Sequence, residues 1–130
     1  ELAAKKGSKR SILLPVSAPF HCAMMAPAAD VLAAELATVL IKEPIIPVVS
    51  NVTADAQSEP DQIIRLLVKQ VTARVRWRES VLYMKDNGVD TFVEVGAGKV
   101  LTGLVRRIDR DLTGVSIQTP ADIEEFLKTL

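Results

Sequence analysis

The chain passes from an apolar run to a helical pattern at Leu14-Pro15-Val16-Ser17-Ala18-Pro19-Phe20-His21-Cys22. Residues 12–16 are almost all apolar, which is typical of a short buried strand. Two prolines end this run, and Pro19 favours an extended conformation for Ala18. The only histidine of the chain follows, and an alanine-rich helical pattern begins within a few residues. The sequence therefore predicts that His21 lies at the carboxyl edge of a sheet, where α/β proteins bind ligands.

His21 and Cys22 each leave two interpretations open. A lone histidine more often forms a hydrogen bond within a turn than takes part in a reaction, but its titration near neutral pH also suits catalysis. Cys22 follows His21 directly, yet adjacent side chains of an extended segment point in different directions. A small, inert thiol is therefore the simpler role for Cys22, and a reactive one the alternative.

Helical and strand patterns alternate along the rest of the chain. Apolar periodicity predicts helices over residues 27–42, 61–71, 77–87 and 99–110 and from 120 onward, and strands over 45–49, 91–95 and 114–117. Residues 53–60 are rich in Ala, Asp, Ser and Pro and indicate a surface loop. The continuous apolar character of residues 91–95 is typical of a parallel strand that is buried on both faces. The alternation predicts an α/β fold with a mostly parallel sheet flanked by helices.

The composition narrows the function classes. The chain has 130 residues, of which 48% are hydrophobic and 25% charged, with 16 basic and 16 acidic side chains. The balanced charge and the aromatic content of 4% argue against a nucleic-acid partner. One cysteine cannot form an intramolecular disulfide or, alone, a cysteine-based zinc site, so we expect a cytoplasmic protein without a metal. No signal peptide or membrane-spanning apolar run is present in the sequence, so we expect no membrane partner.

The turn Gly96-Ala97-Gly98-Lys99 lies between a predicted strand and a predicted helix, where backbone N–H groups can hold a phosphate. A phosphate-binding loop requires Ser or Thr after its lysine and a glycine five positions before the second glycine. Val100 and Val93 occupy those positions. Tight strand-to-helix packing is therefore favoured over a nucleotide-binding α/β protein.

Five segments of the chain form a linked set of motifs: Pro15-Val16-Ser17-Ala18-Pro19-Phe20-His21-Cys22-Ala23-Met24-Met25, Pro47-Val48-Val49-Ser50-Asn51-Val52, Leu67-Val68-Lys69-Gln70, Val75-Arg76-Trp77 and Phe92-Val93-Glu94-Val95-Gly96-Ala97-Gly98-Lys99-Val100-Leu101-Thr102-Gly103-Leu104. In sequence and spacing they resemble malonyl-CoA:acyl carrier protein transacylases of the bacterial fatty-acid synthesis type. The resemblance covers the chain from about Leu13 onward. Several linked motifs are more specific than any one of them.

The resemblance implies an acyltransferase fold with an α/β-hydrolase-like core. Residues 1–15 would be the end of an inserted, small ferredoxin-like subdomain, and residues 16–130 the C-terminal part of the large catalytic domain. Members of the family are much longer than this chain, so we expect a fragment. The family's nucleophilic serine, in a Gly-x-Ser-x-Gly turn, and the arginine that pairs with the malonyl carboxylate would then lie upstream. Without them, we expect the fragment alone to be inactive.

The implied reaction transfers a malonyl group from malonyl-CoA to the phosphopantetheine thiol of acyl carrier protein by a ping-pong mechanism. His21 would be the general base and acid that serves the serine. In this family a main-chain carbonyl, which corresponds to that of Gln70, orients the histidine in place of a carboxylate. Without the resemblance, Gln70 would be interpreted as an ordinary helix C-terminal residue. Malonyl-CoA is a substrate in this mechanism, and we expect no cofactor.

The resemblance also suggests binding residues. Phe20 would lie against the acyl chain and favour malonyl over branched groups, and Asn51 would line the same cleft, although a turn cap is its simpler role. Lys9 and Arg10 would contribute to docking of the acidic carrier protein, with ordinary surface charge as the alternative. The expected partners are the missing N-terminal part of the protein, acyl carrier protein and malonyl-CoA. A non-catalytic α/β binding module with a structural His21 is the alternative function.

Overall fold

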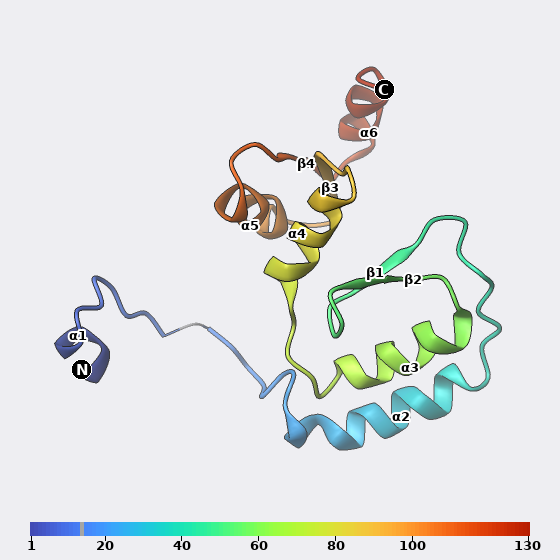
Figure 1. Cartoon of the computed structure of the whole chain (residues 1–130), viewed down its shortest axis with the longest axis horizontal. Helices are drawn as coiled ribbons and strands as arrows, with labels where there is room; N and C mark the ends of the chain where they lie inside the picture. The colour runs from blue at the N-terminus through green and yellow to red at the C-terminus, as the bar shows by residue number, and fades with distance from the viewer. Residues whose placement is uncertain (14) are drawn as a thin grey trace.

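The computed structural model describes residues 1–13 and 15–130 (Figure 1). A short helix α1 (Leu2–Lys5) stands apart from the rest of the molecule. The predicted strand over residues 12–16 is wrong for the residues that the structure describes, and Leu14 lies outside them. Ile12, Leu13 and Val16 are 61%, 98% and 62% exposed and belong to no strand. An apolar run forms a strand only where another strand accepts its backbone hydrogen bonds, and no described residue does so here.

One part of the molecule consists of two helices and a hairpin. Helix α2 (Ala26–Leu36) packs against α3 (Pro60–Gln70), and α3 also contacts β1 (Val48–Ser50). Strand β1 pairs antiparallel with β2 (Asp55–Gln57). The two helices have proline in the first turn, where its missing N–H group is not needed.

Three predictions need correction in this part. The helix predicted over 27–42 ends at Leu36, because the Thr38 hydroxyl and N–H both bond back to the Glu35 carbonyl and the β-branched Val39 and Ile41 follow. The strand predicted over 45–49 begins only at Val48, and Ile45 is fully exposed. The predicted loop over 53–60 contains β2, whose mostly polar sequence carries no strand signal.

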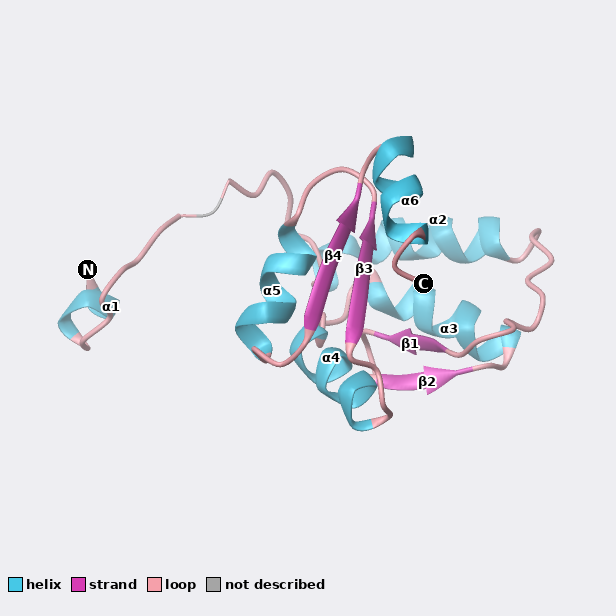
Figure 2. Cartoon of the chain, turned by 90° about the horizontal axis from the view of Figure 1, so that it is seen from above, coloured by secondary structure: helices cyan, strands magenta, loops and turns pink. Residues whose placement is uncertain are grey.

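The other part contains a parallel pair of strands, as predicted. β3 (Thr91–Val95) pairs in parallel with β4 (Thr113–Ile117), and α5 (Val100–Ile108) connects them. α4 (Trp77–Asp86) and α6 (Pro120–Leu127) complete this part. Figure 2 shows the β3–β4 pair running in a different direction from the β1–β2 hairpin. The α/β class is confirmed, with one antiparallel and one parallel strand pair among the described residues.

The main core lies on one face of the parallel pair. Val81, Val105 and Leu112 are buried there, and Phe92 of β3 packs against them. The prediction that β3 is buried on both faces is wrong, because Val93 and Val95 alternate onto an exposed face. The division into residues 1–15 and 16–130 stays a prediction. Among the described residues, no helix has the length and apolarity that crossing a membrane requires.

Candidate active site

His21 occupies a strained turn directly before η1 (Ala23–Met25) and α2. Its φ angle is +58°, in the left-handed region that non-glycine residues rarely adopt. The Phe20 N–H group donates to the Ala18 carbonyl at 2.9 Å, and Cys22 is extended. This turn directs the chain into the helix and leaves the His21 residue exposed. Strain of this kind is concentrated at functional sites.

The His21 ring is held by the end of α3. Its Nδ1 atom lies 2.8 Å from the main-chain carbonyl oxygen of Gln70, which is 49 residues away in the sequence. Gln70 is the last residue of α3, so its carbonyl has no partner within the helix and is free to accept. Since a carbonyl only accepts, the hydrogen bond places the proton on Nδ1 and leaves the lone pair on Nε2. The ring is thereby prepared to accept a proton at Nε2.

The Gln70 side chain shapes the turn that follows. Its Nε2 atom donates to the Ala73 carbonyl at 3.1 Å and lies 3.4 Å from His21 Nδ1. The main-chain contact at 2.8 Å is shorter, so it is the one that orients the imidazole. The side chain therefore closes the turn after α3, and the main chain holds the ring.

A cleft of about 120 Å³ lies between β1 and α3. Its walls are mostly apolar, with a few polar side chains, and are formed by Val48, Val49, Ser50, Asn51, Gln57, Ile63, Leu66, Leu67 and Gln70. Asn51 and Gln70 thus lie in the same cleft, and Gln70 connects the cleft to His21. Phe20 is 56% exposed and is not among the lining residues. Lys9 and Arg10 are exposed and follow α1 in the N-terminal segment.

Sequence reasoning missed two residues that hold the Asn51 turn. The Arg76 N–H group donates to the Asn51 carbonyl at 2.9 Å, and its Nη1 atom donates to the Thr53 carbonyl at 2.9 Å. The Ser80 hydroxyl donates to the Arg76 carbonyl at 3.0 Å and lies 3.5 Å from Asn51 Oδ1. Arg76 lies within the quoted Val75-Arg76-Trp77 motif, but no local pattern indicates contacts to residues more than twenty positions away.

The start of α5, next to the glycine turn, is already occupied by the carboxylate of Glu94. Glu94 of β3 accepts from the Thr102 N–H group at 2.8 Å, from its hydroxyl at 2.7 Å and from the Leu101 N–H group at 3.2 Å. The bonds from Thr102, the N–H group first, hold the pKa of Glu94 below its ordinary value. A phosphate at this helix start would meet a carboxylate, which supports tight packing over nucleotide binding.

Cys22 and the acidic side chains form no metal site in the part of the chain that the structure describes. No group of three or more His, Cys, Asp and Glu side chains lies close enough there to hold a metal ion. The Cys22 thiol donates to the Pro19 carbonyl at 3.1 Å, so the residue bonds within its own turn.

Known proteins are similar to this chain in sequence over nearly its whole length. The chain is 48% identical over 122 residues to the malonyl CoA-acyl carrier protein transacylase of Escherichia coli (strain K12). The matched residues make up 94% of the chain. It is homologous to malonyl-CoA:acyl carrier protein transacylases. The Bacillus subtilis (strain 168) transacylase is 43% identical over 130 residues, or 100% of the chain. The chain spans about 40% of the length of these two relatives. No family model matches it.

Solved structures of transacylases share its fold. The acyl-carrier-protein S-malonyltransferase of Bartonella henselae is 49% identical, with a TM-score of 0.90, and the match covers 98% of this chain and 41% of that one. A malonyl-transacylase solved in complex with its type II PKS acyl-carrier protein is 38% identical, with a TM-score of 0.88, over 98% of this chain and 41% of that one. The resemblance predicted from the sequence is confirmed.

Proposed function

We propose that this chain supplies the histidine base of a malonyl-CoA:acyl carrier protein transacylase. The observation that carries the proposal is the 2.8 Å hydrogen bond between His21 Nδ1 and the Gln70 carbonyl, which leaves Nε2 as the proton acceptor. A base needs a defined tautomer and orientation before it can serve a nucleophile. The homology to transacylases supplies the reaction class.

In the proposed reaction, His21 Nε2 takes the proton of a serine hydroxyl as the serine oxygen attacks the thioester carbonyl of malonyl-CoA. The carbon–sulfur bond then breaks, the proton passes from Nε2 to the departing CoA sulfur, and the serine carries the malonyl ester. In the second half, Nε2 takes the proton of the carrier protein's phosphopantetheine thiol as its sulfur attacks the ester. The proton returns to the serine oxygen.

The proposal assigns the remaining parts of the site to a longer protein. The serine and the arginine for the malonyl carboxylate would lie in the part of the relatives that this chain does not span. Phe20 and Asn51 would contact the acyl group, and the exposed Lys9 and Arg10 would meet the acidic carrier protein. A cytoplasmic location belongs to the same proposal.

Intact mass spectrometry of the full-length parent protein with malonyl-CoA tests this function. We expect a mass increase of one malonyl group, localised by peptide mapping to a residue outside this chain, and almost none in His21→Ala. A full-length protein that gains no malonyl group would favour a binding module with a structural histidine. A malonyl group on Cys22 would contradict the assigned nucleophile.

A further inference from the structure

We propose that Arg76 is a positioning residue that fixes the turn between β1 and β2, and with it the Asn51 wall of the cleft. Its functional consequence rests on the transacylase function proposed above. Arg76 acts through Asn51 and Thr53 and does not itself contact substrate.

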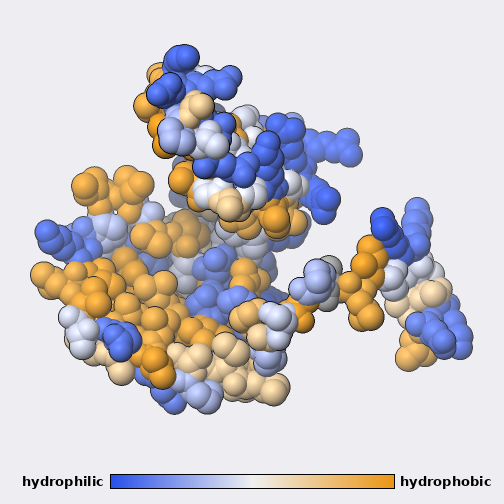
Figure 3. Space-filling view, turned by 180° about the vertical axis from the view of Figure 1, so that it is seen from behind, coloured by the Kyte–Doolittle hydropathy of each residue, from blue (hydrophilic) through white to orange (hydrophobic). Residues whose placement is uncertain are grey.

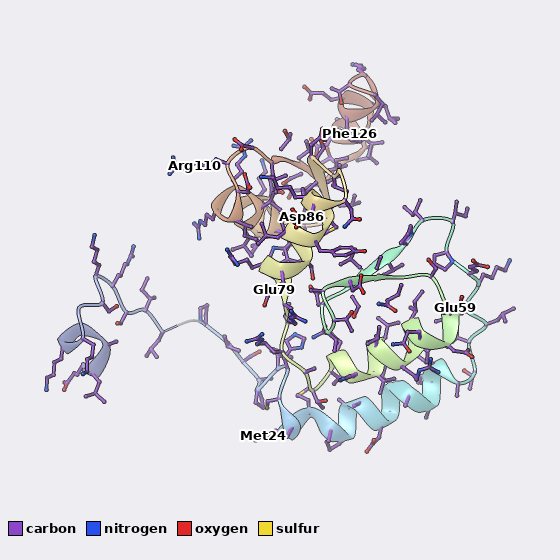
Figure 4. All side chains as sticks on the ribbon, in the orientation of Figure 1. Met24, Glu59, Glu79, Asp86, Arg110 and Phe126 are labelled. Atoms are coloured by element: carbon purple, nitrogen blue, oxygen red, sulfur yellow. The ribbon has the colours of Figure 1, made fainter. Side chains whose placement is uncertain are left out.

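The contacts of Arg76 span the whole turn. Its backbone N–H group bonds to the Asn51 carbonyl and its guanidinium to the Thr53 carbonyl, both at 2.9 Å. Hydrogen bonds from a charged donor are shorter and stronger than neutral ones. Glu79 Oε1, three residues further along the chain, lies 3.6 Å from Arg76 Nε in a partly exposed ion pair. Figure 4 shows Glu79 at the start of α4.

The clamped turn is strained. Ala54, directly after Thr53, is 9% exposed and has a φ of +57°. Within the described ranges, His21 and Ala54 are the non-glycine residues with positive φ. The strained backbone therefore lies at His21, the proposed base, and in the turn between β1 and β2. Two local hydrogen bonds support the turn, from the Ala54 N–H group to the Ser50 carbonyl at 2.8 Å and from the Val52 N–H group to the Ser50 hydroxyl at 3.2 Å. Such conformations persist only where the surroundings hold them, and Arg76 supplies a long-range hold.

The same residue connects the turn to the base. Gln70, which binds His21, lies a short segment before Arg76 in the sequence, and Asn51 lies across the cleft from α3. Arg76 therefore ties the segment that follows the histidine's acceptor to the opposite cleft wall. Losing its guanidinium would release the Thr53 end of the turn, while the backbone N–H bond to Asn51 and the His21–Gln70 hydrogen bond would stay in place.

Steady-state kinetics of the full-length parent protein test this separation of roles. We expect Arg76→Ala to raise KM for malonyl-CoA by at most about tenfold, because the turn would lose the order that one charged hydrogen bond supplies, with a smaller change in kcat. The acidic limb of the pH profile, which reports the His21 base, should not move. The KM of Arg76→Lys should lie between that of the original protein and that of Arg76→Ala, because an ammonium can still reach one carbonyl. Arg78→Ala, an exposed arginine on the same helix, is the matched control.

Amide hydrogen exchange gives a readout that needs no activity. The Ala54 and Val52 N–H groups should exchange faster in Arg76→Ala than in Arg78→Ala, since their protection depends on the clamped turn. Unchanged amide exchange together with an unchanged KM in Arg76→Ala would overturn the proposal. Equal changes of exchange and KM in Arg76→Ala and Arg78→Ala would also overturn it. If His21→Ala keeps full activity, the transacylase proposal fails, and the exchange result still decides whether Arg76 holds the turn.

Discussion

At the scale of single residues, the acceptor for His21 is a neutral main-chain carbonyl. A carbonyl fixes the ring and its tautomer, but it stabilises an imidazolium less than a carboxylate would. The ring therefore has a defined orientation although its acceptor carries no charge. A further consequence is that no side-chain substitution at position 70 removes the accepting atom.

The His21–Gln70 contact predicts unequal effects of two substitutions in the full-length parent protein. His21→Ala should lower the rate by about 10²–10⁴-fold, the range for a general acid–base group. Gln70→Ala should cost less, because it keeps the carbonyl and loses the side-chain bond to Ala73 and the 3.4 Å side-chain contact with His21 Nδ1. Single-turnover rates of malonyl transfer measure both. Equal losses would show that the Gln70 side chain, and not its backbone, carries the role.

At the scale of elements, Glu94 joins three pieces of secondary structure. Its carboxylate on β3 caps the first N–H groups of α5, and the Thr102 hydroxyl that bonds to it also lies 2.8 Å from Ser116 Oγ on β4. Gly114 allows this approach, because a Cβ atom there would lie 2.7 Å from the Thr102 methyl group. The crossover from β3 to β4 is thus held by one polar cluster at a close packing point.

The Glu94 cap predicts a pH-dependent contribution to stability. Hydrogen bonds from Thr102 lower the folded-state pKa of Glu94 below its ordinary value of 4.5, so the contribution is complete above that pH. It is lost as pH falls through the lowered pKa. Thermal unfolding should therefore show Glu94→Gln less stable than the original chain at neutral pH, with the difference shrinking in acid.

Glu125→Gln is the matched control for the Glu94 cap, because Glu125 is exposed on α6. We expect this variant to unfold at nearly the temperature of the original chain at each pH. A Glu94→Gln difference that stays constant from neutral to acidic pH would refute the electrostatic explanation and leave only a packing effect.

Local patterns predicted the β3–α5–β4 unit closely, because its elements pack on their neighbours in the sequence. The predictions of a strand over residues 12–16 and of a helix beyond Leu36 were wrong for the described residues. Whether an apolar run pairs with a strand or packs as a helix depends on the neighbouring elements, which its own sequence does not specify. β2 was missed because its half-exposed, polar residues carry no apolar period. The bond between His21 and Gln70 was expected from family resemblance alone, and the contacts of Arg76 were not expected at all.

At the scale of the whole molecule, a broad apolar surface remains uncovered. Figure 3 shows it over the part of the molecule that contains α2, α3 and the hairpin. The exposed large apolar residues of this part of the chain include Ile45, Ile46, Val48 and Leu67. Large exposed apolar patches mark interaction surfaces in soluble proteins. The chain spans about 40% of its relatives' length, and we expect the remaining part to cover this face.

We expect the chain to associate with itself when it is expressed alone, because association would bury this apolar surface. Sedimentation velocity should show concentration-dependent oligomers, and the double variant Ile45→Glu/Ile46→Glu should reduce them. Leu2→Glu, on the separate helix α1, should have a smaller effect. A chain that stays monomeric at high concentration would show that the exposed face does not drive association.

The 49-residue separation between His21 and Gln70 has a consequence for recombination. Both members of the pair lie within this one chain, so the histidine and the carbonyl that orients it are encoded together. A crossover between homologous genes upstream of His21 would transfer the pair intact. Chimeric proteins built at such a junction would inherit a matched histidine and carbonyl from one parent.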